Sequence, residues 1–323
     1  MVERVDALAS PSYPGGPQIL ETLTLLRPDD WHSHLRDGDA LPQTCADMAR
    51  YMGRVIVMPN LVPPVTNTRL AAEYRQRILR AMPDGRAFEP LMPLYLTDGT
   101  SAEDIREAAA TSWLAGVKLY PAGATTNSAA GVNSLEALYP VLAVMEEVDL
   151  PLLVHGEVTD HDVDIFDREA AFIDAHLAPI VERFPKLRVI LEHITTADSV
   201  DFVSAQGDNV GATITAHHLL LNRNDMLVGG IRPHYYCLPS LNRRRHQEAL
   251  RAAATGSDRS FFLGTDSAPH ARHAKESACG CAGVFTALRQ VEWQIPDTIP
   301  LGNDQMVPLR AGEAVRWQVV PAA

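Results

Sequence analysis

Residues 28–38 read Pro-Asp-Asp-Trp-His-Ser-His-Leu-Arg-Asp-Gly, with two histidines one residue apart and an arginine two residues further on. Alternate residues of a β-strand point to the same face, so His32 and His34 can bind one metal ion together if this stretch is a strand. Two ligands do not complete a metal site. The remaining ligands must come from other parts of the chain.

Four later apolar runs end in a residue that could join this pair. They carry Lys118 in Ala-Gly-Val-Lys-Leu-Tyr, His155 in Leu-Leu-Val-His-Gly-Glu, His193 in Ile-Leu-Glu-His-Ile and Asp266 in Phe-Leu-Gly-Thr-Asp-Ser. Imidazole nitrogen and carboxylate oxygen suit zinc or a neighbouring divalent metal rather than a cysteine-based structural site. Lys118 can join them only if burial makes its amine neutral, so that it adds carbon dioxide and becomes a carbamate able to bridge two metals.

Strand and helix patterns alternate along the rest of the chain. Short apolar runs typical of buried strands are each followed by a segment with helical spacing. Counted from the His-x-His stretch there are eight strands, which predicts an α/β fold of the (β/α)8 TIM barrel type, and the candidate ligands fall at their C-terminal ends, where barrel enzymes have their active sites. An open doubly wound sheet is the alternative, but no Gly-x-Gly-x-x-Gly pattern follows the first strand. The expected strand and helix pairs are 54–60 and 68–82, 88–97 and 101–110, 116–120 and 134–148, 151–157 and 167–184, and 188–194 and 196–205, followed by a strand at 210–217, a helix at 240–254 and a strand at 260–265.

The 323-residue chain has a formal net charge of −12 and a pI near 5.4. Such a chain lacks the basic stripe of a nucleic-acid or anionic-membrane partner, so an anionic substrate would have to be held by a few local cations. Four cysteines are too few for a disulfide framework, and no apolar run has the length of a signal peptide core or a membrane span. We therefore expect a cytoplasmic protein. The cysteines are Cys45, Cys237, Cys279 and Cys281, and the last two alone do not form a zinc module.

The N-terminal residues and the lysines also carry information. A Pro/Gly-rich run at 10–17 predicts a flexible lead-in over 1–18, before one barrel domain over 19–323 that has a flanking edge strand at 22–26. Only three of the 28 basic residues are lysines, namely Lys118, Lys186 and Lys275. A lysine kept in an apolar strand suggests that the amine of Lys118 is needed, although a lysine that reaches solvent from the strand end is the alternative.

Several longer motifs resemble those of the dihydroorotases, specifically the shorter bacterial type. They cover most of residues 28–284 in the family's order, and they include Val57-Met-Pro-Asn-Leu, Lys118-Leu-Tyr-Pro-Ala-Gly-Ala-Thr-Thr-Asn-Ser, Val228-Gly-Gly-Ile-Arg-Pro-His and Gly264-Thr-Asp-Ser-Ala-Pro-His-Ala-Arg-His. The resemblance implies an amidohydrolase-like barrel and a homodimeric enzyme. It would interconvert L-dihydroorotate and N-carbamoyl-L-aspartate in the pyrimidine pathway that leads to UMP.

The resemblance also implies a role for individual residues. One zinc ion would be held by His32, His34, carboxylated Lys118 and Asp266, and a second by Lys118, His155 and His193, with hydroxide between them. Asp266 would take the proton of the attacking water and return it to the leaving nitrogen. The substrate carboxylate would bind Arg36, Asn60 and His270, and the pyrimidine ring would bind backbone groups of Leu238 and Ala282. The loop 121–131, which carries Thr125 and Thr126, would close over the substrate.

Three features depart from the family pattern. Ser33 stands where the family usually has a larger apolar residue, and Gly123 where it usually has asparagine. After Phe285 the family normally continues for some tens of residues, including the helix that covers the last strand, before the closing motif found here at 309–317. We therefore expect a segment to be missing between about residues 281 and 288.

Two other functions are compatible with parts of this pattern. A dihydropyrimidinase or hydantoinase would share the metal site, but its substrates lack the carboxylate that Arg36, Asn60 and His270 would bind. A non-catalytic dihydroorotase-like assembly protein would share the fold, but such chains usually lose metal ligands, and every expected ligand is present here. The sequence therefore favours a catalytically active dihydroorotase.

Overall fold

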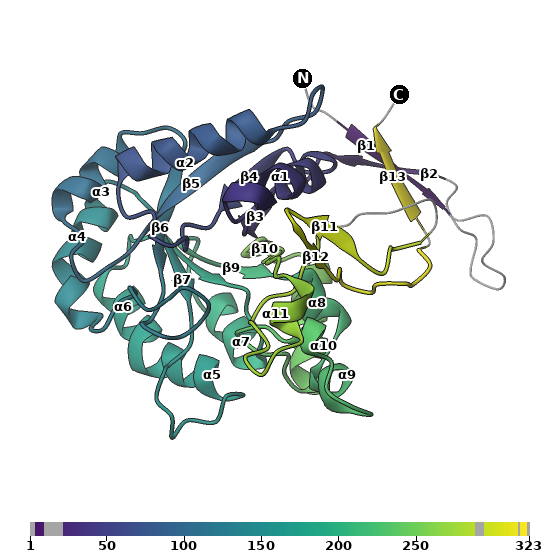
Figure 1. Cartoon of the computed structure of the whole chain (residues 1–323). Coiled ribbons are helices and arrows are strands. Elements are labelled where there is room, and N and C mark those ends of the chain that lie inside the picture. Colours follow the sequence, from purple (N-terminus) through teal and green to yellow (C-terminus); the bar gives the residue numbers. More distant parts are fainter. Residues whose placement is uncertain (1–3, 10–21, 288–293, 316, 322–323) are drawn as a thin grey trace.

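A barrel of eight parallel strands forms the centre of the computed structural model, which describes residues 4–9, 22–287, 294–315 and 317–321 (Figure 1). The strands neighbour one another in chain order. The ring closes just beyond the last strand, where Asp266 N donates to His32 O at 2.8 Å and His34 N donates to Ser267 O at 2.9 Å. The predicted TIM barrel is thus confirmed. Its strands are β3 (Asp30–Ser33), β4 (Arg54–Val57), β5 (Glu89–Tyr95), β6 (Leu114–Leu119), β7 (Leu152–His155), β8 (Val189–Glu192), β9 (Val210–Ile214) and β10 (Phe261–Leu263).

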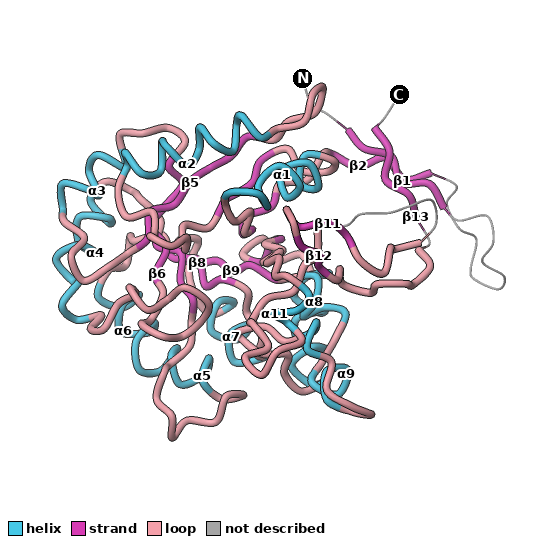
Figure 2. The backbone as a smooth tube through the Cα atoms, viewed as in Figure 1, coloured by secondary structure: helices cyan, strands magenta, loops and turns pink. Residues whose placement is uncertain are grey.

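Helices connect consecutive strands and cover the outside of the barrel (Figure 2). Helix α2, for example, buries an apolar stripe of Ala71, Tyr74 and Ile78 and leaves its polar face in solvent. The helices that separate β3 from β8 are α1 (Leu41–Ala49), α2 (Thr68–Ala81), α3 (Ala102–Ala109), α4 (Tyr139–Glu147) and the interrupted helix of α5 (Arg168–Phe172) and α6 (Ala178–Arg183). Those before β9 and β10 are α7 (Ala197–Ser204), α8 (Ala216–Leu220), α9 (Arg223–Leu227) and α10 (Arg244–Thr255), and single 3-10 turns lie at Gly38–Ala40, Glu136–Leu138 and Pro233–Tyr235.

Polar residues in the loops after the strands fix where the helices begin. Asn67 accepts a hydrogen bond from Leu70 N at the start of α2, and Ser101 and Asp104 form a reciprocal capping box at the start of α3. Thr215 caps α8 in the same way, so β9 ends at Ile214 rather than at the expected residue 217. These caps fix the residue at which each of these loops ends and its helix begins.

The helix expected over 167–184 forms with one interruption. A π-helical turn at Ile173–Leu177 separates α5 from α6, and Pro179 follows it as the second residue of α6. Proline has no backbone N–H to donate, so the regular hydrogen-bond ladder cannot run through this point.

A small antiparallel sheet lies beside the barrel, near both chain ends (Figure 1). It contains β1 (Arg4–Ala9), β2 (Thr22–Leu26) and β13 (Trp317–Pro321) in the order β13-β1-β2. The edge strand expected at 22–26 is therefore confirmed, whereas residues 4–9, which were expected to belong to a flexible lead-in, form strand β1. The remaining residues of the expected lead-in, 1–3 and 10–18, lie outside the described residues.

The chain after β10 is unlike the rest of the barrel. Between β10 and β11, the described residues form one four-residue helix, α11 (Arg272–Lys275), before the hairpin of β11 (Ile299–Leu301) and β12 (Asp304–Met306). The segment expected to be missing between about 281 and 288 falls on a stretch whose described part, 281–287, is continuous, while residue 288 lies outside the described residues. Among the described helices, none combines the length and the apolar character that crossing a membrane requires.

Candidate functional site

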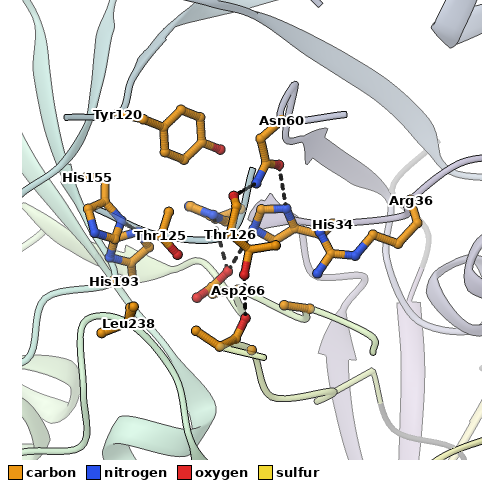
Figure 3. Close-up of a pocket in the computed structure, with 14 residues that line it drawn as sticks. His34, Arg36, Asn60, Tyr120, Thr125, Thr126, His155, His193, Leu238 and Asp266 are labelled. Atoms are coloured by element: carbon orange, nitrogen blue, oxygen red, sulfur yellow. Dashed lines mark hydrogen bonds and ion pairs between the residues drawn. The ribbon is translucent and has the colours of Figure 1, made fainter. Parts of the chain in front are cut away.

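The C-terminal ends of the strands surround a narrow pocket that opens between loops of the barrel (Figure 3). Its volume is about 20 Å³, which is room for about one water molecule. In the view of Figure 3, the rings of His155 and His193 lie on one side of Asp266 and the guanidinium of Arg36 on the other. All the predicted ligand and substrate residues except Lys118 and His270 line this pocket.

His32, His34 and Asp266 converge on one point. The Nε2 atoms of His32 and His34 lie 3.4 Å and 3.0 Å from Asp266 Oδ1. β3 ends at Ser33, so His34 lies just beyond the strand and is held by the backbone bond to Ser267 rather than by strand alternation alone. These three buried side chains have the spacing of a metal-ligand group.

The other nitrogen of each ring faces an oxygen of the protein, and among the described residues only the one in His34 has hydrogen-bond geometry. His34 Nδ1 lies 2.9 Å from Asn60 Oδ1, and His32 Nδ1 lies 3.1 Å from Glu192 Oε1. A ring that donates N–H to an oxygen on one side keeps its other nitrogen free of a proton, which is the state that binds a metal. In a metal-bound ring the N–H would stay on Nδ1, so Nε2 of each ring would be the ligand atom.

His155 and His193 form a second half of the site. His155 ends β7 and His193 follows β8, and His155 Nδ1 lies 3.3 Å from His193 Nε2. This separation is close to the one expected for two nitrogens bound at about 2.0–2.1 Å to one tetrahedral zinc. Glu157 Oε2 accepts from His155 Nε2 at 2.7 Å, which leaves Nδ1 as the free ligand atom.

Lys118 lies in β6 with its side chain fully buried, and its Nζ donates to Glu192. Burial lowers the pKa of the Lys118 amine, while the carboxylate of Glu192 opposes this effect. The Nζ atom also lies 4.9 Å from the centre of the Tyr120 ring. The lysine is therefore enclosed at the site and does not reach solvent from a strand end.

The charge states of the cluster suit metal ligands. Burial lowers the pKa of His34 to about 4 and that of His193 well below its usual range, so both rings are neutral near neutral pH. Burial by itself would raise the pKa of Asp266, but the hydrogen bond from His34 and the nearby histidines hold it well below its usual value. The site thus combines neutral imidazoles with an ionised carboxylate.

Backbone strain is concentrated at the same point. His193 and Asp266, each just after a strand, have φ angles of 43° and 46°, and Arg36 has a φ of 61°. A residue other than glycine in this left-handed region costs about 1–3 kcal/mol, and such residues cluster at functional sites. The strain turns these side chains into the pocket.

The residues expected to bind the substrate carboxylate lie together at one edge of the pocket. Arg36 Nε donates to Pro269 O at 3.0 Å, and Arg36 Nη2 lies 2.9 Å from His270 Nε2. The same His270 nitrogen lies 2.9 Å from Ala282 O, and it can serve only one of these two neighbours at a time. Burial lowers the pKa of His270 to about 3, so the ring is neutral.

The loop 121–131 covers the pocket. Thr125 and Thr126 line it, together with Leu238 and Ala282 from the opposite wall. Thr126 Oγ1 donates to Ala282 O at 3.2 Å, and Asn60 Nδ2 donates to Thr126 O at 3.0 Å. Gly123 has a φ of 79°, a region that glycine and asparagine both tolerate, which explains why glycine can replace the family's asparagine there.

Three residues at the site had no role in the sequence analysis. Glu192 contacts both His32 and Lys118, Glu157 fixes His155, and Tyr120 lines the pocket. Each lies one or two residues from a predicted ligand. That adjacency was the only signal in the sequence, because which carboxylate turns toward which ring depends on the fold.

His217, His218 and Cys237 form another buried group with metal-ligand spacing. However, His218 Nδ1 lies 2.7 Å from Thr215 Oγ1, and its Nε2 lies 3.2 Å from Pro239 O. Cys237 Sγ also donates to Pro239 O, at 3.3 Å. Because both nitrogens of His218 are already in use, we interpret this group as part of the structure and not as a metal site.

Comparison with known proteins bears on this arrangement. Residues 29–318 match the model of the amidohydrolase family. A dihydroorotase from Pseudomonas fluorescens is 55% identical, with 93% of this chain and 98% of that protein covered. Its alignment spans 342 positions, whereas 93% of 323 residues is about 300, so about 40 positions hold no residue of this chain.

Two solved structures share the fold over most of their length. A dihydroorotase from Campylobacter jejuni superposes with a TM-score of 0.82 at 32% identity, covering 91% of this chain and 96% of that one. A dihydroorotase from Saccharomyces cerevisiae, solved in complex with 5-fluoroorotic acid, gives a TM-score of 0.82 at 29% identity and 99% coverage of both chains.

Proposed function

The chain belongs to the amidohydrolase family and, within it, to the dihydroorotases, and from this premise we propose how its residues perform the reaction. The enzyme is a hydrolase that opens the cyclic amide of L-dihydroorotate to give N-carbamoyl-L-aspartate, and it catalyses the reverse ring closure in pyrimidine biosynthesis. The observation that supports the assignment best is the convergence of His32, His34, His155, His193 and Asp266 in one pocket that Arg36 also lines.

We propose that this pocket holds two zinc ions. His32, His34 and Asp266 would bind one, His155 and His193 the other, and carboxylated Lys118 would bind both. When bound, the two cations lower the pKa of a water molecule to near neutrality and polarise the ring carbonyl. The 3.3 Å separation of the ring nitrogens of His155 and His193, and the oxygen partners behind His32, His34 and His155, support this ligand set.

Carboxylation of Lys118 fits its surroundings. The neutral amine would attack carbon dioxide and lose one proton to become a carbamate, which places an anion near the neutral rings of His34 and His193. The product keeps one N–H, and Glu192 already accepts a hydrogen bond from this nitrogen. Intact-protein mass measured under native conditions should show one added carbon dioxide. The loss of that mass in Lys118→Ala is the control, and a bare amine in metal-loaded protein would refute the modification.

Asp266 is the proposed proton carrier. Its carboxylate is ionised, lies at the centre of the pocket and faces both His32 and His34. In hydrolysis it would take a proton from the attacking water and deliver it to the ring nitrogen as the amide bond breaks. In ring closure Asp266 would take the proton from the nitrogen that attacks and return it to the water that leaves.

Arg36 and His270 would hold the substrate carboxylate. An arginine offers a planar pair of donors that matches a carboxylate, and a neutral His270 can donate one further hydrogen bond. The yeast relative binds 5-fluoroorotic acid, which also joins a carboxylate to a pyrimidine ring. Asn60 can join them only when its Nδ2 leaves Thr126 O, so we propose that its contact with the substrate is coupled to loop movement.

The loop 121–131 acts as the proposed lid. With room for about one water, the pocket cannot admit dihydroorotate while Thr126 is bound to Ala282 and Asn60. Opening would break these two hydrogen bonds. Once the substrate is in place, Thr125 and Thr126 would bind it from above while Leu238 and Ala282 bind the ring from the opposite wall.

We also propose that the positions without a counterpart in this chain fall after β10. All three residues of β10 are only half-buried, whereas all five of β9 are buried. A strand of this barrel is normally covered by the helix that follows it. In this region the described residues contain α11 alone, so the barrel domain would lack its eighth outer helix.

The assembly and location of the enzyme are further proposals. By similarity to its relatives it would be a cytoplasmic homodimer that acts on a small molecule and needs no nucleic acid or membrane partner. Its charge of −12 supports the absence of both kinds of partner. Light scattering at several protein concentrations should give twice the chain mass, and a constant monomer mass would contradict the dimer.

A substrate panel tests the assignment. Purified enzyme should hydrolyse L-dihydroorotate, with little turnover of dihydrouracil or hydantoin, because only the first carries the carboxylate for Arg36 and His270. Arg36→Met should reduce the difference in turnover between dihydroorotate and the two substrates that lack the carboxylate. Comparable turnover of dihydrouracil by the unmodified enzyme would overturn the substrate assignment.

A further inference from the structure

Lys275 is a buried lysine that lies outside the pocket. It ends α11, is 3% exposed, and is one of only three lysines in the chain. Its Nζ donates to Tyr236 O at 2.8 Å, Cys281 O at 2.7 Å and Gly283 O at 2.9 Å. An ammonium group has three N–H donors and no acceptor, so each donor has one carbonyl. Burial lowers the pKa of Lys275 to about 8, which leaves the ammonium as the main form at neutral pH.

The three carbonyls belong to two segments that form one wall of the pocket. Leu238 follows Tyr236 by two residues, and Ala282 lies between the other two acceptors. Leu238, Ala282 and Gly283 all line the pocket. The segments touch through one backbone hydrogen bond as well, from Gly283 N to Tyr236 O at 3.0 Å. Lys275 therefore stands behind this wall and joins its two halves.

The second segment needs such a tie because its backbone is strained. Gly280, Cys281 and Gly283 have φ angles of 71°, 33° and 149°. The value at Cys281 is unfavourable for any residue with a side chain. A Cβ on Gly283 would lie 2.8 Å from Ala268 Cβ, so the backbone passes very close to the residues that follow Asp266. A strained segment packed this tightly keeps its shape only if other groups hold it.

We propose that Lys275 is a positioning residue for the substrate, which fixes the backbone at Leu238 and Ala282 by bridging Tyr236, Cys281 and Gly283. The proposal rests on the ring contacts given under the proposed function. It also explains why this position holds a lysine, in a chain where most other basic residues are arginine. Three carbonyls that converge on one atom match a compact ammonium, whereas a guanidinium spreads its donors over a planar fork.

The first test is the kinetics of Lys275→Met, with Lys186→Met as the matched control because Lys186 is exposed. The KM for dihydroorotate should rise about tenfold or more, since charged hydrogen bonds that shape the pocket are lost. The kcat and the zinc content should stay within about twofold, because the metal ligands and Asp266 do not touch Lys275. Lys186→Met should match the unmodified enzyme. An unchanged KM, or kcat and zinc content that fall together, would overturn the proposal.

Hydrogen exchange gives a second readout that needs no substrate. Amides of 236–241 and 280–284 should exchange faster in Lys275→Met, while those of β7 keep their rates. If the amides of both segments exchange at the same rate in Lys275→Met as in the unmodified enzyme, Lys275 does not hold the two segments together. If the methionine variant does not fold, Lys275→Gln, which keeps two N–H donors, takes its place with a smaller expected change. If the unmodified enzyme does not hydrolyse dihydroorotate, the assigned function fails, and exchange still decides the role of Lys275.

Discussion

The two ends of the barrel interior have opposite chemistry. At the C-terminal ends of the strands, the buried side chains are histidine, aspartate, lysine and glutamate, held in strained or desolvated states. At the N-terminal ends lies a cavity of about 320 Å³ with a mostly apolar lining, formed by Trp31, Ile56, Ala115, Pro151, Leu153, Ile190, Glu192 and Phe262. Among the residues that line this cavity, Glu192 also contacts His32 and Lys118, two of the proposed metal ligands. The comparison indicates that one end serves the chemistry and the other serves stability.

Asp266→Ala should have the largest effect, because it removes the proposed proton carrier, which is also a proposed metal ligand. We expect kcat/KM for dihydroorotate to fall by about ten-thousandfold. The free energy of unfolding should fall modestly, because the partners that keep the pKa of Asp266 low also stabilise its ionised form in the folded protein. Steady-state kinetics and urea unfolding measure the two quantities. Substantial remaining activity would contradict the assigned role.

Arg36→Met should have the next largest effect on activity. Losing the charged partner of the substrate carboxylate should raise KM by about 10- to 100-fold, the usual worth of a hydrogen bond from a charged group. Arg69→Met is the control, because Arg69 is exposed and pairs with Glu73 on α2, away from the pocket. Equal KM values for both variants would show that Arg36 does not bind the substrate.

Leu153→Ala tests the apolar end. Leu153 is 3% exposed in β7 and packs with Ile56 and Met58 inside the barrel. Truncation should lower the free energy of unfolding by about 2–5 kcal/mol, while kcat/KM of the folded enzyme stays unchanged. Leu79→Ala, at an exposed position on α2, should cost far less. A loss of activity without a loss of stability would contradict the proposal that the apolar end of the barrel serves stability and not catalysis.

Ala115→Val should have the smallest effect. The added methyl groups would enter the cavity beside Leu153 and should raise the free energy of unfolding by about 0.8 kcal/mol per buried carbon at most, without changing kcat/KM. Thermal unfolding of Ala115→Val and of the unmodified enzyme at equal protein concentration measures the difference in stability. A clear loss of stability would mean that the cavity wall is too rigid to accept the larger side chain.

The sequence predicted the barrel because each buried strand and each helix has a local signature. The strand β1 was missed because the Pro/Gly-rich run at 10–17 suggested a boundary between it and its neighbour β2, and because its other partner, β13, lies more than 300 residues away. Strand β9 ends early because Thr215 acts as a helix cap, and a strand pattern does not reveal that choice.

The site was predictable to the extent that its residues end strands. His155, His193 and Asp266 follow buried runs, and parallel strands bring their ends together at one rim. Glu192 and Glu157 were missed because a carboxylate next to a histidine is common, and only the fold shows that each turns toward a ring nitrogen. No sequence motif indicated the role of Lys275, because its three hydrogen-bond acceptors are backbone atoms.

Zinc titration of chelator-treated enzyme tests the central claim most directly. The account predicts that metal-free protein keeps its fold, shown by unchanged far-UV circular dichroism, but has lost dihydroorotate hydrolysis. Activity should return as zinc is added and reach its maximum at two zinc ions per chain. Full activity in protein shown to be free of metal would contradict the account.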